Sequence, residues 1–160
     1  MQEDHIKPLA HIPQGRAGRI YQSMDDIAFR GLYTDGFISC SIIVCIGKRN
    51  GRISLAHADQ FYYLKEIAEE MQWVGEDCEF IILHHPRGMM QLEWYKKRFG
   101  DKISRIHALA DQCYGVSVSF TPSAENKLHP LIAIYNKDQL PRDIVRHPDE
   151  RNFMTGHHIE

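Results

Sequence analysis

The sequence lacks the features that mark several large classes of protein. It has no low-complexity tract and no internal repeat, which excludes fibrous and solenoid architectures. Its longest uncharged stretch, residues 36–47, is far too short to span a bilayer, and the polar N-terminus lacks the pattern of a signal peptide. The formal net charge is −2 and no basic stripe is present for binding phosphates. We therefore expect neither membranes nor nucleic acids as partners.

Cysteine is scarce, and its spacing has no CxxC pattern. The cysteines are Cys40, Cys45, Cys78 and Cys113, and three of them lie in or beside apolar runs. That placement predicts buried thiols in a reducing compartment, so we expect a cytoplasmic protein. A cytoplasmic site of action also suits an effector or toxin that reaches a target cell by a route without a cleavable signal.

Histidine is frequent, but its placement does not favour a metal site. The pair His84-His85 ends an apolar run, and adjacent side chains of a strand point to opposite faces. No HxxH or CxxC pattern supports a zinc site that would combine this pair with Cys40 and His57. We therefore expect no metal and no other cofactor.

The chain of 160 residues is long enough for one domain with a substantial core. Residues 1–22 are polar and contain several Pro and Gly residues, which predicts an irregular N-terminal arm. We expect a single catalytic α+β domain over residues 23–140, followed by a polar C-terminal tail over residues 141–160.

Hydrophobic periodicity predicts both strands and helices within this domain. Strands are expected at 27–33, 40–46, 52–58, 78–83, 116–121 and 131–135, with a turn at 34–36. Helices are expected at 59–74, 91–99 and 104–112. The first helix would be capped by Asp59 and would expose Glu66, Glu69 and Glu70 to solvent. Strands that come both consecutively and between helices predict an α+β fold with a mixed or antiparallel sheet.

Cys40 and His57 are the most informative residues, because strand parity places them together. The stretch from Lys48 to Gly51 contains Asn-Gly, which favours a hairpin between the two strands. A four-residue loop sets His57 opposite Ile42, and Cys40 then lies diagonally at roughly 7–8 Å between backbones on the same face. A two-residue loop would keep the shared face but separate the two side chains by one further pair.

A thiol beside an imidazole is the working unit of nucleophilic acyl and amide chemistry. The plainer alternative is structural, because a Cys on an apolar strand is usually an inert core thiol. A half-buried, hydrogen-bonded His57 and a turn residue Thr34 would fit the same alternative, as would Asp59 acting only as a helix cap.

The segment around these residues resembles three related groups of deamidases. Chemoreceptor glutamine deamidases share the order and spacing of Thr34, Ser39-Cys40, an apolar strand and His57, and often repeat a Cys at the position of Cys45. Protein N-terminal asparagine amidohydrolases are similar in the stretches Cys40–Val44 and Leu55–Asp59. Cytotoxic-necrotizing-factor-like toxins are similar in their Cys–His core. The resemblance covers about a seventh of the chain, and Ile38 stands where the chemoreceptor enzymes usually have Gly.

The resemblance implies a β-sandwich-like core flanked by helices and an amide hydrolase that uses a Cys-His-Thr triad. Cys40 would be the nucleophile, His57 the acid and base that lowers its pKa, and Thr34 the residue that orients the imidazole. Ser39 and Asp59 would lie near the substrate or the oxyanion, and the backbone N–H of Cys40 is one candidate oxyanion donor. The expected partner is a protein substrate that presents a Gln or Asn side chain.

Two other functions remain open at this point. The same dyad would serve a transglutaminase or a thiol protease, since both also proceed through a thioester. A domain of this fold without activity would instead be a protein-binding module.

Overall fold

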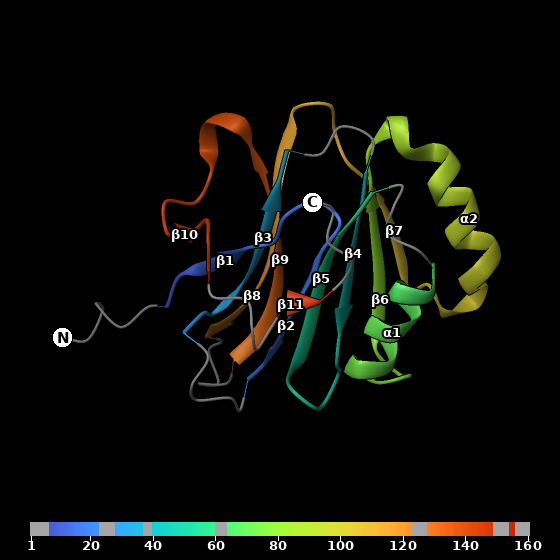
Figure 1. Cartoon of the computed structure of the whole chain (residues 1–160), viewed down its shortest axis with the longest axis horizontal. Coiled ribbons are helices and arrows are strands. Elements are labelled where there is room, and N and C mark those ends of the chain that lie inside the picture. The colour runs from blue at the N-terminus through green and yellow to red at the C-terminus, as the bar shows by residue number, and fades with distance from the viewer. Residues whose placement is uncertain are drawn as a thin grey trace.

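The computed structural model describes residues 7–22, 28–36, 40–59, 64–122, 128–148 and 154–155. Two β-sheets stack face to face, and two helices cover the far side of one of them, so that the molecule has three layers (Figure 1). Both sheets are mixed. The predicted α+β class, with a sandwich-like core flanked by helices, is confirmed.

The five-stranded sheet has the strand order β10-β1-β3-β8-β9. Its strands are β10 (Ile144–Val145), β1 (Leu9–His11), β3 (Gly31–Asp35), β8 (Cys113–Pro122) and β9 (Leu128–Asn136). Strand β1 runs parallel to both β10 and β3, whereas β8 is antiparallel to both β3 and β9.

The six-stranded sheet has the strand order β11-β2-β5-β4-β6-β7. Its strands are β11 (Met154–Thr155), β2 (Ala17–Tyr21), β5 (Arg52–Ala58), β4 (Ser41–Ile46), β6 (Glu79–His84) and β7 (Arg105–Ala108). Only the β6–β7 pair is parallel. The helices are α1 (Leu64–Val74) and α2 (Met89–Phe99), with 3-10 turns at Pro86–Gly88, Gly100–Lys102 and Lys137–Gln139. Among the described helices, none is both long and apolar enough to cross a membrane.

Side chains along the strands of the six-stranded sheet point alternately to its two faces, and each face packs into a separate core. The inter-sheet core comprises Ala10, Ile12, Ile20, Leu32, Cys40, Ile42, Val44, Ile46, Ile53, Leu55, Ile81, Leu83, Leu109, Cys113, Val116, Val118 and Phe120. The helix-side core comprises Ala17, Ile43, Cys45, Ala56, Ala58, Ile67, Met71, Val74, Cys78, Phe80, Ile82, Leu92, Tyr95 and Phe99. Strand β4 is buried on both faces, which is why it reads as a continuous apolar run.

The β4–β5 hairpin has a four-residue loop, one of the two lengths that the sequence left open. The Gly47 N–H donates to the Arg52 carbonyl over 2.8 Å, and the ladder then pairs Ile46 with Ile53 and Ile42 with His57. Gly51 has φ +71°, a conformation that glycine adopts at little cost, and its position explains the turn. The expected register between the Cys40 and His57 strands is therefore confirmed.

The two chain ends contribute strands where an arm and a tail were expected. Within residues 1–22, β1 lies between β10 and β3, and β2 lies between β11 and β5. Within residues 141–160, β10 and β11 complete the same two sheets. The Pro and Gly residues in and around β1 and β2 predicted an irregular arm, and β10 and β11, with two residues each, are too short to show a period of two.

Two internal predictions are also corrected. The predicted turn at 34–36 is wrong, because Thr34 and Asp35 are the last two residues of β3 and only Gly36, with φ +74°, lies outside the strand. The predicted helix at 104–112 is wrong, because β7 pairs with β6 along a sheet edge. All four β7 residues are exposed, so no buried face marks the strand in the sequence.

One charged residue of helix α1 is buried where the sequence predicted exposure to solvent. The positions predicted as its first turn, residues 60–63, lie outside the described residues, and the described helix begins at Leu64. Glu70 was expected to face solvent, but it is buried against β2 and β5. Arg19 donates to both of its carboxylate oxygens over 2.9 and 2.7 Å, and the Ser54 hydroxyl donates over 3.0 Å. The ion pair compensates for the burial of the charge.

Replacing Glu70 with Gln should lower the free energy of unfolding by roughly 1–3 kcal/mol, because Arg19 loses its charged partner while side-chain volume is kept. The matched control is Glu69→Gln, at an exposed position of the same helix. Urea denaturation of both variants measures the difference. Equal midpoints for the two would show that the buried ion pair contributes nothing.

Candidate active site

Three of the predicted site residues lie where β3 and β5 end and β4 begins, at the upper end of the sandwich in Figure 1. Cys40 directly precedes β4, and His57 lies near the end of β5. Both belong to the inter-sheet side of the six-stranded sheet, given the parity of their neighbours in the inter-sheet core. Thr34, near the end of β3, belongs to the opposing sheet and is fully buried. The site is therefore built from both sheets.

A hydrogen bond across the sandwich joins Thr34 to His57. The Thr34 Oγ1 atom lies 2.6 Å from His57 Nδ1 and 2.7 Å from the carbonyl oxygen of Ile12. A hydroxyl has a single proton, and the carbonyl can only accept, so Thr34 donates to Ile12 and accepts from the Nδ1–H of His57. The neutral imidazole then carries its lone pair on Nε2.

Burial makes His57 a neutral imidazole at physiological pH. Its exposed fraction is 1%, and desolvation lowers its pKa to about 4. The negative charges of Asp59 and Asp35 raise this pKa, and the nearby His11 lowers it, but desolvation dominates. His57 is therefore suited to accept a proton as a general base rather than to form a permanent ion pair.

Cys40 lies diagonally across the hairpin from His57. The ladder pairs Ile42 with His57, and its terminal pair is Ser41 with Ala58. Cys40 is the residue before Ser41, two positions from Ile42, so it lies on the same face as His57. Diagonal neighbours lie roughly 7–8 Å apart between backbones, a gap that a Cys and a His side chain can close. Cys40 keeps an exposed fraction of 8%, against 0% for Thr34.

Asp59 is a buried carboxylate beside His57. It directly follows β5, and its Oδ2 atom accepts a hydrogen bond of 3.2 Å from Gln14 Nε2. It lies before the described start of α1 at Leu64, and its charge raises the pKa of His57. Asp59 therefore acts on the imidazole in addition to any part in helix capping. Ser39, the other residue predicted near the substrate, lies outside the described residues.

The sequence did not reveal the network that holds the end of β3. On the far face of the five-stranded sheet, Asp35 accepts from Tyr33 over 2.9 Å, from Arg146 over 2.9 Å and from His11 over 3.3 Å. Burial raises the pKa of Asp35, but these hydrogen bonds outweigh it and lower the value to about 2. The network anchors the residue next to Thr34. His11 and Arg146 are far from Asp35 in the chain, so no local signal marks the network.

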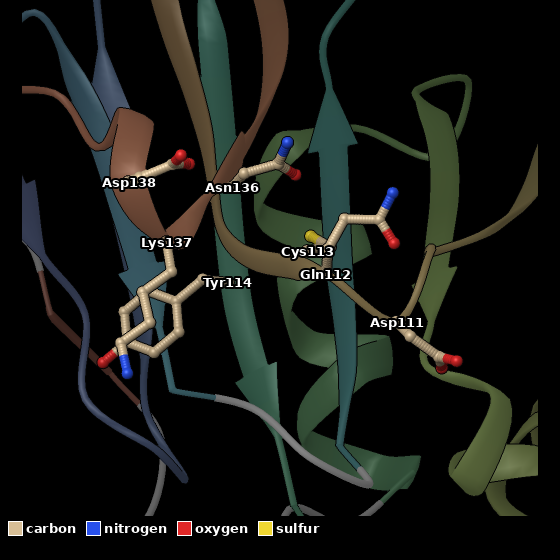
Figure 2. Close-up of a pocket in the computed structure, with 7 residues that line it drawn as sticks. All are labelled: Asp111, Gln112, Cys113, Tyr114, Asn136, Lys137 and Asp138. Atoms are coloured by element: carbon tan, nitrogen blue, oxygen red, sulfur yellow. The ribbon is translucent and has the colours of Figure 1, made fainter.

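An open depression lies near this end of the molecule, with a volume of about 740 Å³. Figure 2 shows its lining: Asp111, Gln112, Cys113, Tyr114, Asn136, Lys137 and Asp138. The start of β8 is tied to the end of β3, since the Gly36 N–H donates to the Tyr114 carbonyl over 3.2 Å. Cys113 also belongs to the inter-sheet core that contains Cys40. The depression thus borders the layer in which Thr34 and Cys40 lie.

No group of three or more His, Cys, Asp or Glu side chains in the described ranges is arranged to hold a metal ion. His84 and His85 are both buried, and His84 Nδ1 lies 3.4 Å from the His85 carbonyl oxygen. All four cysteines of the chain are described, and none forms a disulfide.

Comparison with known proteins returned no matching family model and no matching curated protein. The resemblance to deamidases stays a prediction carried by the residues of the site.

The depressed pKa of His57 predicts a pH dependence of stability. The unfolded chain binds a proton at His57 near pH 6.5 and the folded chain only near pH 4, so acid favours unfolding. Above pH 6.5, His57 is neutral in both states and does not lower the free energy of unfolding. As the pH falls toward 4, the free energy of unfolding decreases by about 2–3 kcal/mol, because the unfolded chain takes up the proton first. Urea denaturation across this range measures the slope. His57→Gln should flatten it, and an unchanged slope would show that other groups are responsible.

Proposed function

We propose that this protein is a cysteine-dependent amidohydrolase that deamidates a Gln or Asn side chain of a protein substrate through a thioester. One observation carries the proposal: His57 donates Nδ1–H to Thr34 across the sandwich and shares a sheet face with Cys40. Thr34 holds the imidazole in one orientation through Nδ1, as the third member of a hydrolase triad does. It also leaves the Nε2 lone pair as the proton acceptor.

In the first half-reaction, the Cys40 thiol gives its proton to Nε2 of His57, and the sulfur attacks the carboxamide carbon. The tetrahedral intermediate collapses when the imidazolium returns the proton to the leaving nitrogen, and ammonia departs. Water then attacks the thioester with His57 as base. The carboxylate leaves, and the thiol regains its proton.

Thr34 and Asp59 would support His57 in different ways. Thr34, itself held by the Ile12 carbonyl, keeps the ring in one tautomer and one orientation. Burial disfavours the imidazolium that forms during the reaction, and the negative charge of Asp59 offsets part of this cost. The backbone N–H of Cys40 is the proposed oxyanion donor.

The depression between the start of β8 and the end of β9 would bind the peptide that flanks the target amide. Its lining combines the carboxylates of Asp111 and Asp138 with the ammonium of Lys137. The amides of Gln112 and Asn136 offer both donors and acceptors. Such a mixed lining suits a polar peptide backbone with charged side chains, and the proposed chemistry requires no cofactor.

The decisive test combines turnover with covalent trapping. Wild-type protein should release ammonia from peptides that present Gln or Asn without cleaving the chain, and Cys40→Ser should abolish this. A peptide that carries a chloromethyl ketone in place of the carboxamide should alkylate Cys40 only when His57 is present. Cys78→Ser, at a thiol of the helix-side core, is the matched control and should react normally.

Other outcomes of this test separate the alternatives. Peptide cleavage would identify a thiol protease, and incorporation of an added amine would identify a transglutaminase. If Cys40 neither turns over peptides nor reacts with the ketone in the folded protein, the enzyme proposal is wrong and a protein-binding module remains.

The cross-sheet hydrogen bond can be tested by a matched pair of variants. Thr34→Val removes the hydroxyl at nearly constant shape and should lower kcat by about 10- to 100-fold, with little change in KM. Thr34→Ser keeps the hydroxyl and should retain most of the activity. Equal losses in both variants would indicate that Thr34 contributes packing instead of orientation.

A further inference from the structure

A second histidine lies beside the candidate nucleophile, on the strand that flanks β4 on its other side. The antiparallel β4–β6 ladder ends at the pair of Ser41 with His84. Cys40 precedes the first of these residues and His85 follows the second, so the two lie opposite each other. Residues directly opposite in an antiparallel pair share a face, with Cβ atoms about 4.5–5.5 Å apart. Cys40 therefore has a histidine on each side, His57 on the diagonal and His85 directly across.

The chain at His85 favours the extended backbone that this placement requires. Pro86 follows His85, and the residue before a proline is biased toward an extended conformation. Side chains of an extended segment alternate, so His85 lies on the same face as Ile81 and Leu83, which belong to the inter-sheet core. Cys40 belongs to that core as well, and both Cys40 and His85 are buried.

A backbone hydrogen bond selects the tautomer of His85. The Arg87 N–H donates to His85 Nδ1 over 3.3 Å, within the 3-10 turn that follows β6. An imidazole that accepts at Nδ1 has its lone pair there and carries its proton on Nε2. Among the hydrogen bonds between described residues, none uses Nε2 of His85. His85 is therefore a hydrogen-bond donor with this N–H still to give.

The two histidines beside Cys40 have opposite tautomers and suit different tasks. His57 donates through Nδ1 to Thr34 and keeps a lone pair on Nε2, which can take the proton of the thiol. His85 keeps a proton on Nε2, and that atom can donate a hydrogen bond but cannot accept a proton. A fixed donor in a buried site stabilises negative charge that develops next to it.

We propose that His85 is the side-chain donor of the oxyanion site, an inference that rests on the deamidase function proposed above. When the Cys40 sulfur attacks the carboxamide carbon, the C–S bond forms and an electron pair of the C=O bond moves onto oxygen. The Nε2–H of His85 donates a hydrogen bond to this oxyanion, and His85 keeps its proton. The electron pair returns to the carbonyl as ammonia leaves, and the same donor serves the attack of water on the thioester. All proton transfers remain with His57.

The test compares turnover with alkylation, because only turnover passes through an oxyanion. His85→Ala should lower kcat for ammonia release from a Gln peptide by at least about 100-fold, the typical effect of losing one oxyanion donor. The limiting rate of Cys40 alkylation by iodoacetamide at high pH should stay within about twofold of wild type, since displacement at a saturated carbon forms no oxyanion. His85→Gln retains an N–H donor and should recover part of the lost kcat.

The matched control is His107→Ala, at an exposed histidine of β7, which should leave kcat near the wild-type value. An unchanged kcat in His85→Ala would overturn the assignment and leave the deamidase function intact. Equal losses of turnover and of limiting alkylation rate would also overturn it, because they would show a general disturbance of the site. If wild-type protein releases no ammonia, the deamidase function itself fails, and the role of His85 is refuted with it.

Discussion

The side chains of β4 and β5 alternate between two buried environments, and the candidate active site depends on this alternation. Cys40 and His57 point toward the five-stranded sheet, whereas Cys45 points toward the helices. The β4–β5 register, set by the four-residue loop before Arg52, decides which residues share a face. A slip of one residue would turn His57 to the opposite face of the sheet, away from Cys40 and Thr34.

Burial sets the chemistry of His57 as much as its neighbours do. A histidine inside an apolar core resists protonation, so His57 is a neutral imidazole. The cross-sheet hydrogen bond to Thr34 selects the tautomer, and the negative charge of Asp59 offsets part of the effect of burial on the His57 pKa. Orientation comes from one sheet and electrostatic support from the other.

The central strands and their pairing could be predicted because they carry strong local patterns. The apolar run of β4, the Asn-Gly turn and the alternation of β5 together specify the hairpin, and α2 was recognised within two residues of its start. Strands β1, β2 and β7 were missed because each is short or exposed. Thr34 and Asp35, the last residues of β3, were taken for a turn because Gly36 follows them.

The sequence by itself determined that Cys40 and His57 lie on one face of a hairpin, since strand parity and turn chemistry are local properties. Only the tertiary structure decided that Thr34 meets His57, because that contact joins two sheets and the other partner of Thr34, Ile12, directly follows β1, a strand without a visible pattern. The burial of Glu70 is of the same kind. Helical and strand periods tell which side a residue faces, but the element packed on that side is chosen by the whole chain.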